Sequence, residues 1–457
     1  MTCLAGWQAL HAQVTPSDSL YSVAHLQEDL AYLKKQVYDV HAFPHTEYNR
    51  AQYDQLFNSL QSQITHPLNA TAFLRLLKPA IAHLADEHAN IGMPQSRLTA
   101  ALNVQPVFLP FTLEKKGAFY YVADLLAGNH LVKSGQAIAE INGVDINTWI
   151  DRCANFASGY ADQRAATVVR RFGYYFGWAN TRNDTSFSIR LLEGKTYRVA
   201  GVDLEAWNVY YDQQAGKTNC TERIRYHQTG NTGFIDACSF DAKKTGPYTL
   251  NTIRARIDSI FNVIKETGIK NLVIDVSNNE GGNSAVGDYL IAYINRKPYQ
   301  DYRSTWKRSA EYQRLYESWG FKNEQYNNTP IGETIQFQPG TVTPPVVPYP
   351  FTGKVMVLVG KHTFSSAILF ATLIKDNAIA PIAGQEPADG HPNHFGEMYN
   401  TKLPHTKIDL RFGVKEWIRP AGKETKDGNR LVPDIILTDK EMLDEKAVIK
   451  KALMTRK

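Results

Sequence analysis

Ser365 and Ser366 are the side chains whose place along the chain best suits nucleophilic chemistry. They follow an apolar run at residues 354–359 and a short polar turn, and a second apolar run begins directly after them. This pattern predicts a buried strand, a turn and a helix that begins at the serines. The first N–H groups of a helix are unpaired and carry partial positive charge, which suits a nucleophile whose attack creates an oxyanion. The same position also suits a simple helix cap, for which serine is favoured.

A second strand-to-turn junction lies at residues 271–283. An apolar run ends at Asp275, and the Asn-Glu-Gly-Gly segment that follows contains Gly281 and Gly282. Glycines let backbone N–H groups approach a ligand closely, although a plain turn that needs positive φ explains them equally well. The segment lacks the Lys-Ser/Thr ending of a phosphate-binding loop. Because two such turns end neighbouring strands, we expect N–H groups of Gly281 or Gly282 and of Ser366 to hold an oxyanion.

The elements that position these turns change in character along the chain. Apolar residues recur at helical spacing near the N-terminus, short β-rich runs with glycine turns follow, and strands then alternate with helices, which indicates a mainly parallel α/β core. We expect Pro79 to kink a helix. The divisions that we predict are a signal-peptide remnant at 1–13, a helical domain at 14–97, a β-rich domain with a helical insertion at 98–205, the α/β core at 206–445 with an irregular, lid-like insertion at 296–350, and a C-terminal tail at 446–457.

Composition excludes several classes of protein. The net charge of the 457 residues is +5, and the basic residues are scattered, so we expect no nucleic-acid partner. No run reaches the roughly 18 apolar residues of a membrane span. The four cysteines and the histidines show no metal-ligand spacing, so we expect no metal and no cofactor. Cys220 and Cys238 could pair in an exported protein, but we expect free thiols.

Four segments resemble segments of the tail-specific, or C-terminal processing, serine peptidase family, and they occur along this chain in the same order as in that family. Residues 275–282 resemble its Asp-Leu-Arg-x-Asn-x-Gly-Gly turn, with Ser277 and Glu280 as departures that we interpret as solvated turn residues. Residues 363–367, with Asp376 eleven positions after Ser365, resemble its nucleophile helix and favour Ser365 over Ser366 as the nucleophile. Residues 131–144 are similar to its PDZ stretch, and residues 432–435, which include Asp434, are similar to its closing strand.

The resemblance implies a crotonase-like, mainly parallel α/β core preceded by a small helical domain and a PDZ-like domain. It implies a serine endopeptidase that hydrolyses extended or C-terminal polypeptide segments through an acyl-enzyme on Ser365, in the periplasm or outside the cell. A catalytically degenerate relative that binds peptides without cutting them is the alternative. A thioester-processing enzyme on a similar core would need acidic catalytic residues, and a PDZ-like domain has no role there.

The general base is the open question of this prediction. Better-known members of the family use a lysine in a Phe-Gly-Lys-Gly segment after the serine, whereas residues 384–397 of this chain contain no lysine. A neutral imidazole can deprotonate a serine instead. His88 lies in a segment that resembles the family's Leu-x-Asp-Gly-His-Thr, and a histidine of that region is the base in the tricorn-like branch. His391 and His394 lie where the lysine would stand and are the alternatives.

Overall fold

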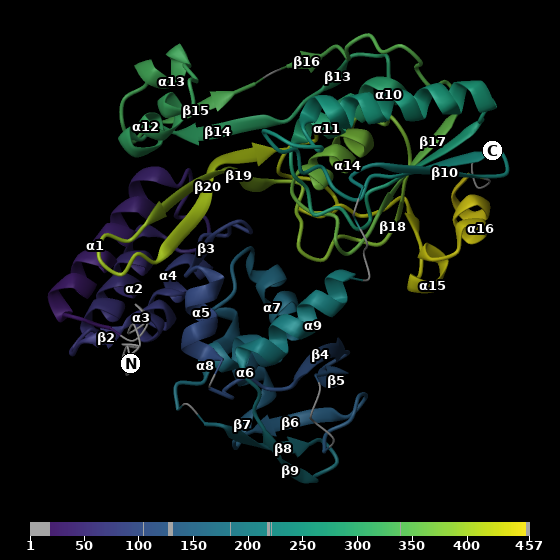
Figure 1. The fold of residues 1–457 in the computed structure, drawn as a ribbon. Coiled ribbons are helices and arrows are strands. Elements are labelled where there is room, and N and C mark those ends of the chain that lie inside the picture. Colours follow the sequence, from purple (N-terminus) through teal and green to yellow (C-terminus); the bar gives the residue numbers. More distant parts are fainter. Residues whose placement is uncertain are drawn as a thin grey trace, which may run out of the picture.

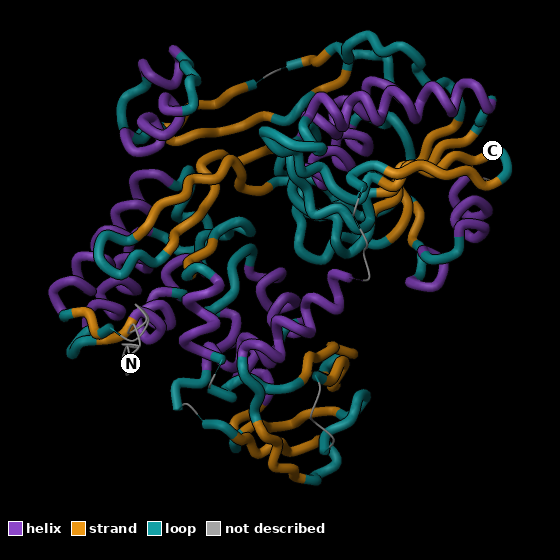
Figure 2. Tube along the Cα trace, in the orientation of Figure 1, coloured by secondary structure: helices purple, strands orange, loops and turns teal. Residues whose placement is uncertain are grey.

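The computed structural model describes residues 19–103, 105–126, 131–182, 184–216, 220, 222–338 and 340–453. The expected signal-peptide remnant at 1–13 lies outside the described residues. Figures 1 and 2 show three regions: helices near the N-terminus, a β-rich region and an α/β core. None of the described helices combines the length and the apolar character that a membrane span requires.

The N-terminal region is helical because its apolar residues recur on one side of each helix. Leu26, Leu30, Leu33 and Val37 of α1 are all buried, as their spacing predicts. Pro79 is the first residue of α4, so it separates two helices instead of kinking one. The elements are β1 (Leu20–Tyr21), α1 (Val23–Val40), α2 (Arg50–Gln63), β2 (Leu68–Asn69), α3 (Ala70–Leu77), α4 (Pro79–Ala82), β3 (Asn90–Gly92) and α5 (Gln95–Leu102).

The β-rich region contains one twisted sheet and three helices. The strand order is β4-β5-β6-β8-β9, with β7 paired to β6. Its elements are β4 (Phe111–Lys116), β5 (Phe119–Leu125), β6 (Ala137–Ile141), β7 (Val144–Asp145), α6 (Ile146–Ala154), α7 (Ala161–Arg170), α8 (Phe172–Ala179), β8 (Ser186–Leu191) and β9 (Thr196–Ala200). The next helix, α9 (Leu204–Gly216), buries Trp207 against the helical region and not against the core to which we assigned residues from 206 onward.

The α/β core is a sheet in the order β10-β11-β12-β17-β18-β21, in which only the β10–β11 pair is antiparallel. One face packs against α10, α11 and α14. The strands are β10 (Arg225–Thr229), β11 (Thr232–Asp236), β12 (Asn271–Asp275), β17 (Lys354–Val359), β18 (Ile382–Gly384) and β21 (Ile435–Ile436), and the helices are α10 (Leu250–Thr267), α11 (Ser284–Ile294) and α14 (Ser366–Asp376).

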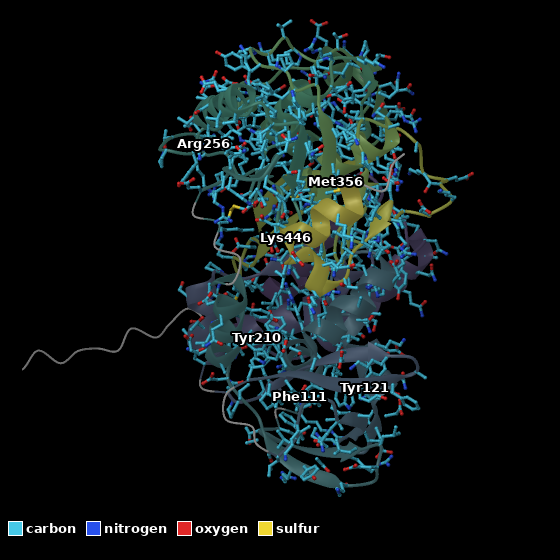
Figure 3. The ribbon with its side chains drawn as sticks, turned by 90° about the vertical axis from the view of Figure 1, so that its right-hand side faces the viewer. Phe111, Tyr121, Tyr210, Arg256, Met356 and Lys446 are labelled. Atoms are coloured by element: carbon cyan, nitrogen blue, oxygen red, sulfur yellow. A yellow bond between two sulfur atoms is a disulfide. The ribbon has the colours of Figure 1, made fainter. Side chains whose placement is uncertain are left out.

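The C-terminal segment covers the other face of this sheet. Met356 of β17 and Val448 of α16 belong to one buried cluster. Figure 3 labels Met356 and Lys446, and Lys446 is also a residue of α16. Val448 and Ile449 therefore pack on the core sheet, within the segment that the sequence predicted to be a tail. The helices involved are α15 (Asp439–Met442), α16 (Glu445–Val448) and a π-helix (Ile449–Leu453).

The segment that we expected to be irregular, 296–350, contains helices and strands along about half of its described length. Two of its strands join the hairpin of β19 (His394–Lys402) and β20 (Asp409–Ile418) in a sheet of order β15-β14-β20-β19. Trp306, Tyr312 and Tyr326 pack together in the buried core of the helical region, which explains the aromatic composition. Its elements are β13 (Tyr299–Gln300), β14 (Arg303–Lys307), α12 (Ala310–Ser318), α13 (Glu324–Asn328), β15 (Thr334–Phe337) and β16 (Thr341–Val342).

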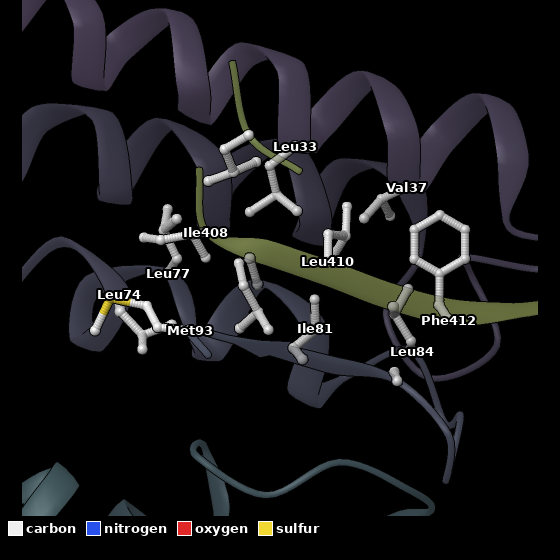
Figure 4. Close-up of a cluster of buried hydrophobic side chains, with 14 of the residues drawn as sticks. Leu33, Val37, Leu74, Leu77, Ile81, Leu84, Met93, Ile408, Leu410 and Phe412 are labelled. Carbon is white, nitrogen blue, oxygen red and sulfur yellow. The ribbon is translucent and has the colours of Figure 1, made fainter. Parts of the chain in front are cut away.

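Strand β20 connects the core to the helical region. Its side chains Leu410 and Phe412 lie among Leu33 and Val37 of α1 and the residues of α3 and α4 (Figure 4). Strand β3 pairs with β20 at residues 409–411. The loop between α4 and β3 is thereby held against the core, although it precedes the core by more than a hundred residues in the sequence.

Cys220 and Cys238 form a disulfide, so the expectation of free thiols was wrong. The bridge ties the connection after α9 to the segment that follows β11. The reason that the sequence misled us is that two cysteines at an uninformative spacing do not reveal how close the fold brings them. Cys153 is buried and unbridged.

Candidate active site

Ser365 lies at the junction of β17 and α14, where the sequence predicted a strand, a turn and a helix. Its backbone has φ 52° and ψ −125°, a conformation that is rare for a residue with a side chain. Its side chain makes no capping hydrogen bond to the helix. The hydroxyl is thus free of the capping role that the sequence allowed.

Hydrogen bonds between the two predicted turns hold this strained residue in place. The hydroxyl of Thr363 donates to the carbonyl oxygen of Val276 (2.8 Å) and accepts from the N–H of Gly360 (2.9 Å). The N–H of Phe364 donates to the carbonyl oxygen of Asn279 (3.0 Å). The turn after β12 therefore supports the backbone that leads into the serine, as two turns at the ends of adjacent parallel strands can do.

His88 is the side chain that the structure places against Ser365. Its Nε2 lies 3.1 Å from Ser365 Oγ, and its ring packs on Phe364 at a centroid distance of 4.9 Å. His88 comes from the loop between α4 and β3, 277 residues away in the sequence. Within the described chain, no other side chain hydrogen-bonds the Ser365 hydroxyl, so serine and imidazole form a pair with the geometry of a nucleophile and a base.

Asp86 fixes the loop that carries His88. One carboxylate oxygen accepts the backbone N–H of His88 (2.8 Å), and the other accepts the N–H of Gly413 in β20 (2.7 Å). The buried His41, whose Nδ1 accepts the N–H of Phe43, faces the second oxygen with Nε2 at 3.4 Å. Our sequence interpretation gave Asp86 no role, yet an acidic residue inside the apolar Leu84-Ala85-Asp86 run was a signal of a buried, hydrogen-bonded carboxylate.

Charge and burial act on the His88 ring in opposite directions. Burial lowers the pKa of His88, the Asp86 carboxylate opposes that shift, and the Arg411 guanidinium adds to it, with a net result below 6.5. The buried Nδ1 makes no hydrogen bond of ordinary geometry within the described residues, although the nearby Phe395 carbonyl favours the charged ring. A lowered pKa keeps the imidazole neutral near pH 7, the state in which Nε2 can accept a proton.

The two alternative bases lie elsewhere and have other partners. His391 Nδ1 contacts the buried carboxylate of Glu87, and this partner outweighs burial and raises the pKa of His391. The ring of His394 stacks obliquely at 5.8 Å from that of His88, and its Nδ1 lies 2.9 Å from the carbonyl oxygen of His391. Burial lowers the pKa of His394 to about 3. Within the described chain neither ring contacts Ser365.

The three expected oxyanion donors are not equivalent. The N–H of Gly281 donates to the side-chain oxygen of Asn279 (2.8 Å), so it is already occupied, and we withdraw Gly281 as a donor. The N–H groups of Gly282 and Ser366 have no partner among the described residues. A Cβ on Gly281 would lie 2.7 Å from Ser365 Cβ and 2.9 Å from Ser366 N. Gly281 therefore leaves open the space in front of the Ser366 donor.

Other residues of the quoted motifs have structural contacts. The Asp376 carboxylate accepts two hydrogen bonds from the guanidinium of Arg419 (2.9 and 2.5 Å), in a buried ion pair. Asp434 accepts the backbone N–H of Ile382 (2.9 Å). Glu280 is exposed, whereas Ser277 is buried, contrary to the prediction of a solvated side chain. The reason is that the backbone of the turn after β17 passes close to Ser277.

Comparison with known proteins gives matches for the core and for the whole fold. Residues 231–437 match Peptidase family S41. The structure of mature CPAF complexed with lactacystin aligns with 94% of this chain and 98% of its own, at 17% identity and a TM-score of 0.60. Mature CPAF aligns with 91% and 93%, at 16% identity and a TM-score of 0.58. The photosystem II D1 C-terminal processing protease aligns with 93% of this chain and 96% of its own, at 13% identity and a TM-score of 0.45. No curated protein matches the chain in a sequence comparison.

Proposed function

We propose that the chain is a serine-type peptidase of family S41, which residues 231–437 match, and that it is an endopeptidase acting through an acyl-enzyme on Ser365. Its substrates are extended or C-terminal polypeptide segments. The observation that carries the proposal is the 3.1 Å contact between Ser365 Oγ and His88 Nε2. Nucleophile and base within hydrogen-bond reach are the minimum that serine peptidase chemistry requires.

The reaction follows from the positions of the described groups. Ser365 Oγ attacks the scissile carbonyl carbon while His88 Nε2 takes the hydroxyl proton, and the negative charge on the carbonyl oxygen is stabilised by the N–H groups of Gly282 and Ser366. His88 then gives the proton to the leaving amine as the C–N bond breaks. Water, deprotonated by the same imidazole, attacks the acyl-enzyme and releases the new carboxyl terminus with the regenerated serine.

In this proposal His88 replaces the lysine that better-known relatives use. Two observations support the replacement. Residues 384–397 contain no lysine, and the hydroxyl of Ser365 has an imidazole as its side-chain partner within the described chain. Asp86 is a positioning residue in this scheme, because it holds the His88 backbone and its charge favours the imidazolium that forms during the reaction.

The surrounding regions suggest how substrates reach the site and where the protein works. We assign the β-rich region to a PDZ-like domain that docks extended polypeptide segments, on the similarity of residues 131–144 to a PDZ stretch. We place the protein in the periplasm or outside the cell. The disulfide between Cys220 and Cys238 supports that location, because disulfides persist in oxidising compartments.

Labelling with a fluorophosphonate probe tests the proposal. We expect the purified wild-type chain to be labelled, and labelling to be abolished in Ser365→Ala and retained in the neighbouring Ser366→Ala, whose hydroxyl donates to the carbonyl oxygen of Gly282 (2.7 Å). Peptidase activity is measured in parallel by mass spectrometry of the fragments that the chain releases from denatured casein. A folded wild-type chain that neither reacts with the probe nor cleaves casein would leave peptide binding without cleavage as the function.

A further inference from the structure

On the face of strand β20 that carries Arg411, this arginine is exposed, whereas Gly413 and Lys415 are buried. Along this strand Leu410, Phe412 and Val414 are buried in the cluster that includes the helical region, so the residues between them point to the opposite face. Arg411 is one of these residues, and it is exposed. Gly413, next on the same face, is the strand residue whose N–H binds Asp86.

Strand pairing places Arg411 between two amides and next to the His88 loop. Its cross-strand partner in β3 is Asn90, and its partner in β19 is Asn400. Paired residues of antiparallel strands point to the same face of a sheet, and both asparagines are exposed. Asn90 is only two residues after His88, so Arg411 lies beside the strand into which the His88 loop leads.

The Arg411 guanidinium has no acidic partner in the part of the chain that the structure describes. Within the described residues it forms no ion pair and no side-chain hydrogen bond. The acidic residue of this face, Asp409, is paired with Lys402 instead. Arg411 is near enough to His88 to lower the pKa of the imidazole. An exposed, unpaired arginine so close to a base is unfavourable for the charged base, which indicates a function other than stabilising the free protein.

We propose that Arg411 binds a carboxylate of the polypeptide substrate next to the scissile bond, and so determines substrate specificity. The inference rests on the proposed peptidase function and names the chemistry that its substrates share. Arginine is the side chain best suited to a carboxylate because its planar guanidinium can donate two parallel hydrogen bonds. The amides of Asn90 and Asn400 on either side add neutral donors. The carboxylate belongs either to an acidic side chain or to the chain terminus of the substrate.

Matched peptides distinguish these two sources. A peptide is built around an acid-containing cleavage site mapped on denatured casein, with the site near its C-terminus. A second version has each acidic side chain near the scissile bond replaced by its amide, and a third has an amidated C-terminus. We expect the wild-type kcat/KM to fall roughly 5- to 50-fold for the version that lacks the recognised carboxylate. Arg411→Ala should abolish that difference between peptides and Arg411→Lys should restore part of it.

Controls separate failure of this inference from failure of the proposed function. Arg256→Ala removes an exposed arginine of α10, outside the region proposed to dock peptides, and should leave the peptide ratios of the wild type unchanged. If the wild type cleaves all versions equally, or if Arg411→Ala keeps the wild-type ratios, the assignment of Arg411 is wrong while the peptidase proposal stands. If the wild type cleaves none of the peptides and no casein, the peptidase proposal itself is wrong, and the carboxylate site is wrong with it.

Discussion

Replacing His88 by alanine tests the reaction scheme most directly. The substitution removes the single side chain that hydrogen-bonds Ser365 Oγ among the described residues. A positioned general base contributes about 10²–10⁴-fold to the rate. We therefore expect kcat/KM to fall by that factor, which corresponds to about 3–5 kcal/mol of transition-state stabilisation. Adding Ser365→Ala to the variant should lower the rate little further, because the two residues act as one unit.

The pH profile supplies a second readout of the same substitution. Burial lowers the pKa of His88, Arg411 adds to this shift, Asp86 opposes it, and the ring of His394 stays neutral beside it. Only the neutral imidazole accepts a proton, so wild-type kcat/KM should rise with pH through an inflection below 6.5. The inflection should disappear in His88→Ala, while Arg411→Met should move it upward, because a repelling positive charge has been removed.

The assay follows cleavage of a fluorogenic casein-derived peptide from about pH 4.5 to about pH 8.5, a range that spans the reference pKa of histidine. His227→Ala is the matched control, since it removes an exposed histidine of the core strand β10. Circular dichroism must show that each variant is folded. If folded His88→Ala keeps more than about a tenth of the wild-type rate, the effect is below the range expected for a lost base and the assignment is refuted. Loss of activity in His394→Ala but not in His88→Ala would refute it in favour of the alternative base.

Further variants test the parts around the pair. Gly281→Ala should lower kcat at least about 10²-fold with a smaller change in KM, because the added Cβ would crowd Ser365 and block an oxyanion donor. Stopped-flow acylation by an active ester measures the rate of the first step, and a wild-type acylation rate in this variant would contradict the prediction. Asp86→Asn should lower the free energy of unfolding in urea by about 1–3 kcal/mol, because one of the two N–H donors that the buried carboxylate binds loses its acceptor. The same variant should have a lower kcat. If both values are unchanged, the positioning role of Asp86 is refuted. Burial raises the pKa of Glu87 to about 7, and the pKa of its partner His391 is also raised, so the folded chain binds protons more tightly than the unfolded chain. The free energy of unfolding should therefore fall as pH rises from about 4.5 to above 7. Glu87→Gln should flatten that slope.

The core was predictable from the sequence because its signals are local. The apolar runs that became β12 and β17 are followed by turns that contain glycine, and α14 begins at Ser366, directly after the turn that follows β17. Strand, turn and helix each depend on neighbouring residues, so their order and the place of the serine follow from short-range patterns. Helix α1 was equally accessible, because its buried leucines repeat at helical spacing.

The misjudged features depend on contacts between residues far apart in the sequence. Strands β14 and β15 lie in a stretch rich in aromatic and polar residues, and they are strands because β14 pairs with β20 and β15 pairs with β14. The disulfide likewise depends on how near the fold brings Cys220 to Cys238. The involvement of Gly281 was misjudged at a finer level, because a single side-chain oxygen, that of Asn279, decides which N–H is occupied.

From the sequence, the choice of general base between His88 and the two histidines that follow Ser365 stayed open, because His88 lies outside the part of the chain that contains the serine. The region that matches the peptidase family, 231–437, contains the serine and both glycine turns but not His88. His88 reaches Ser365 because β3 pairs with β20, and because Asp86 binds the N–H of Gly413 in that strand. The core by itself thus contains the proposed nucleophile and the proposed oxyanion donors but not the proposed base. The proposed catalytic pair is completed where the helical region docks on β20, so its geometry depends on that interface as much as on the core.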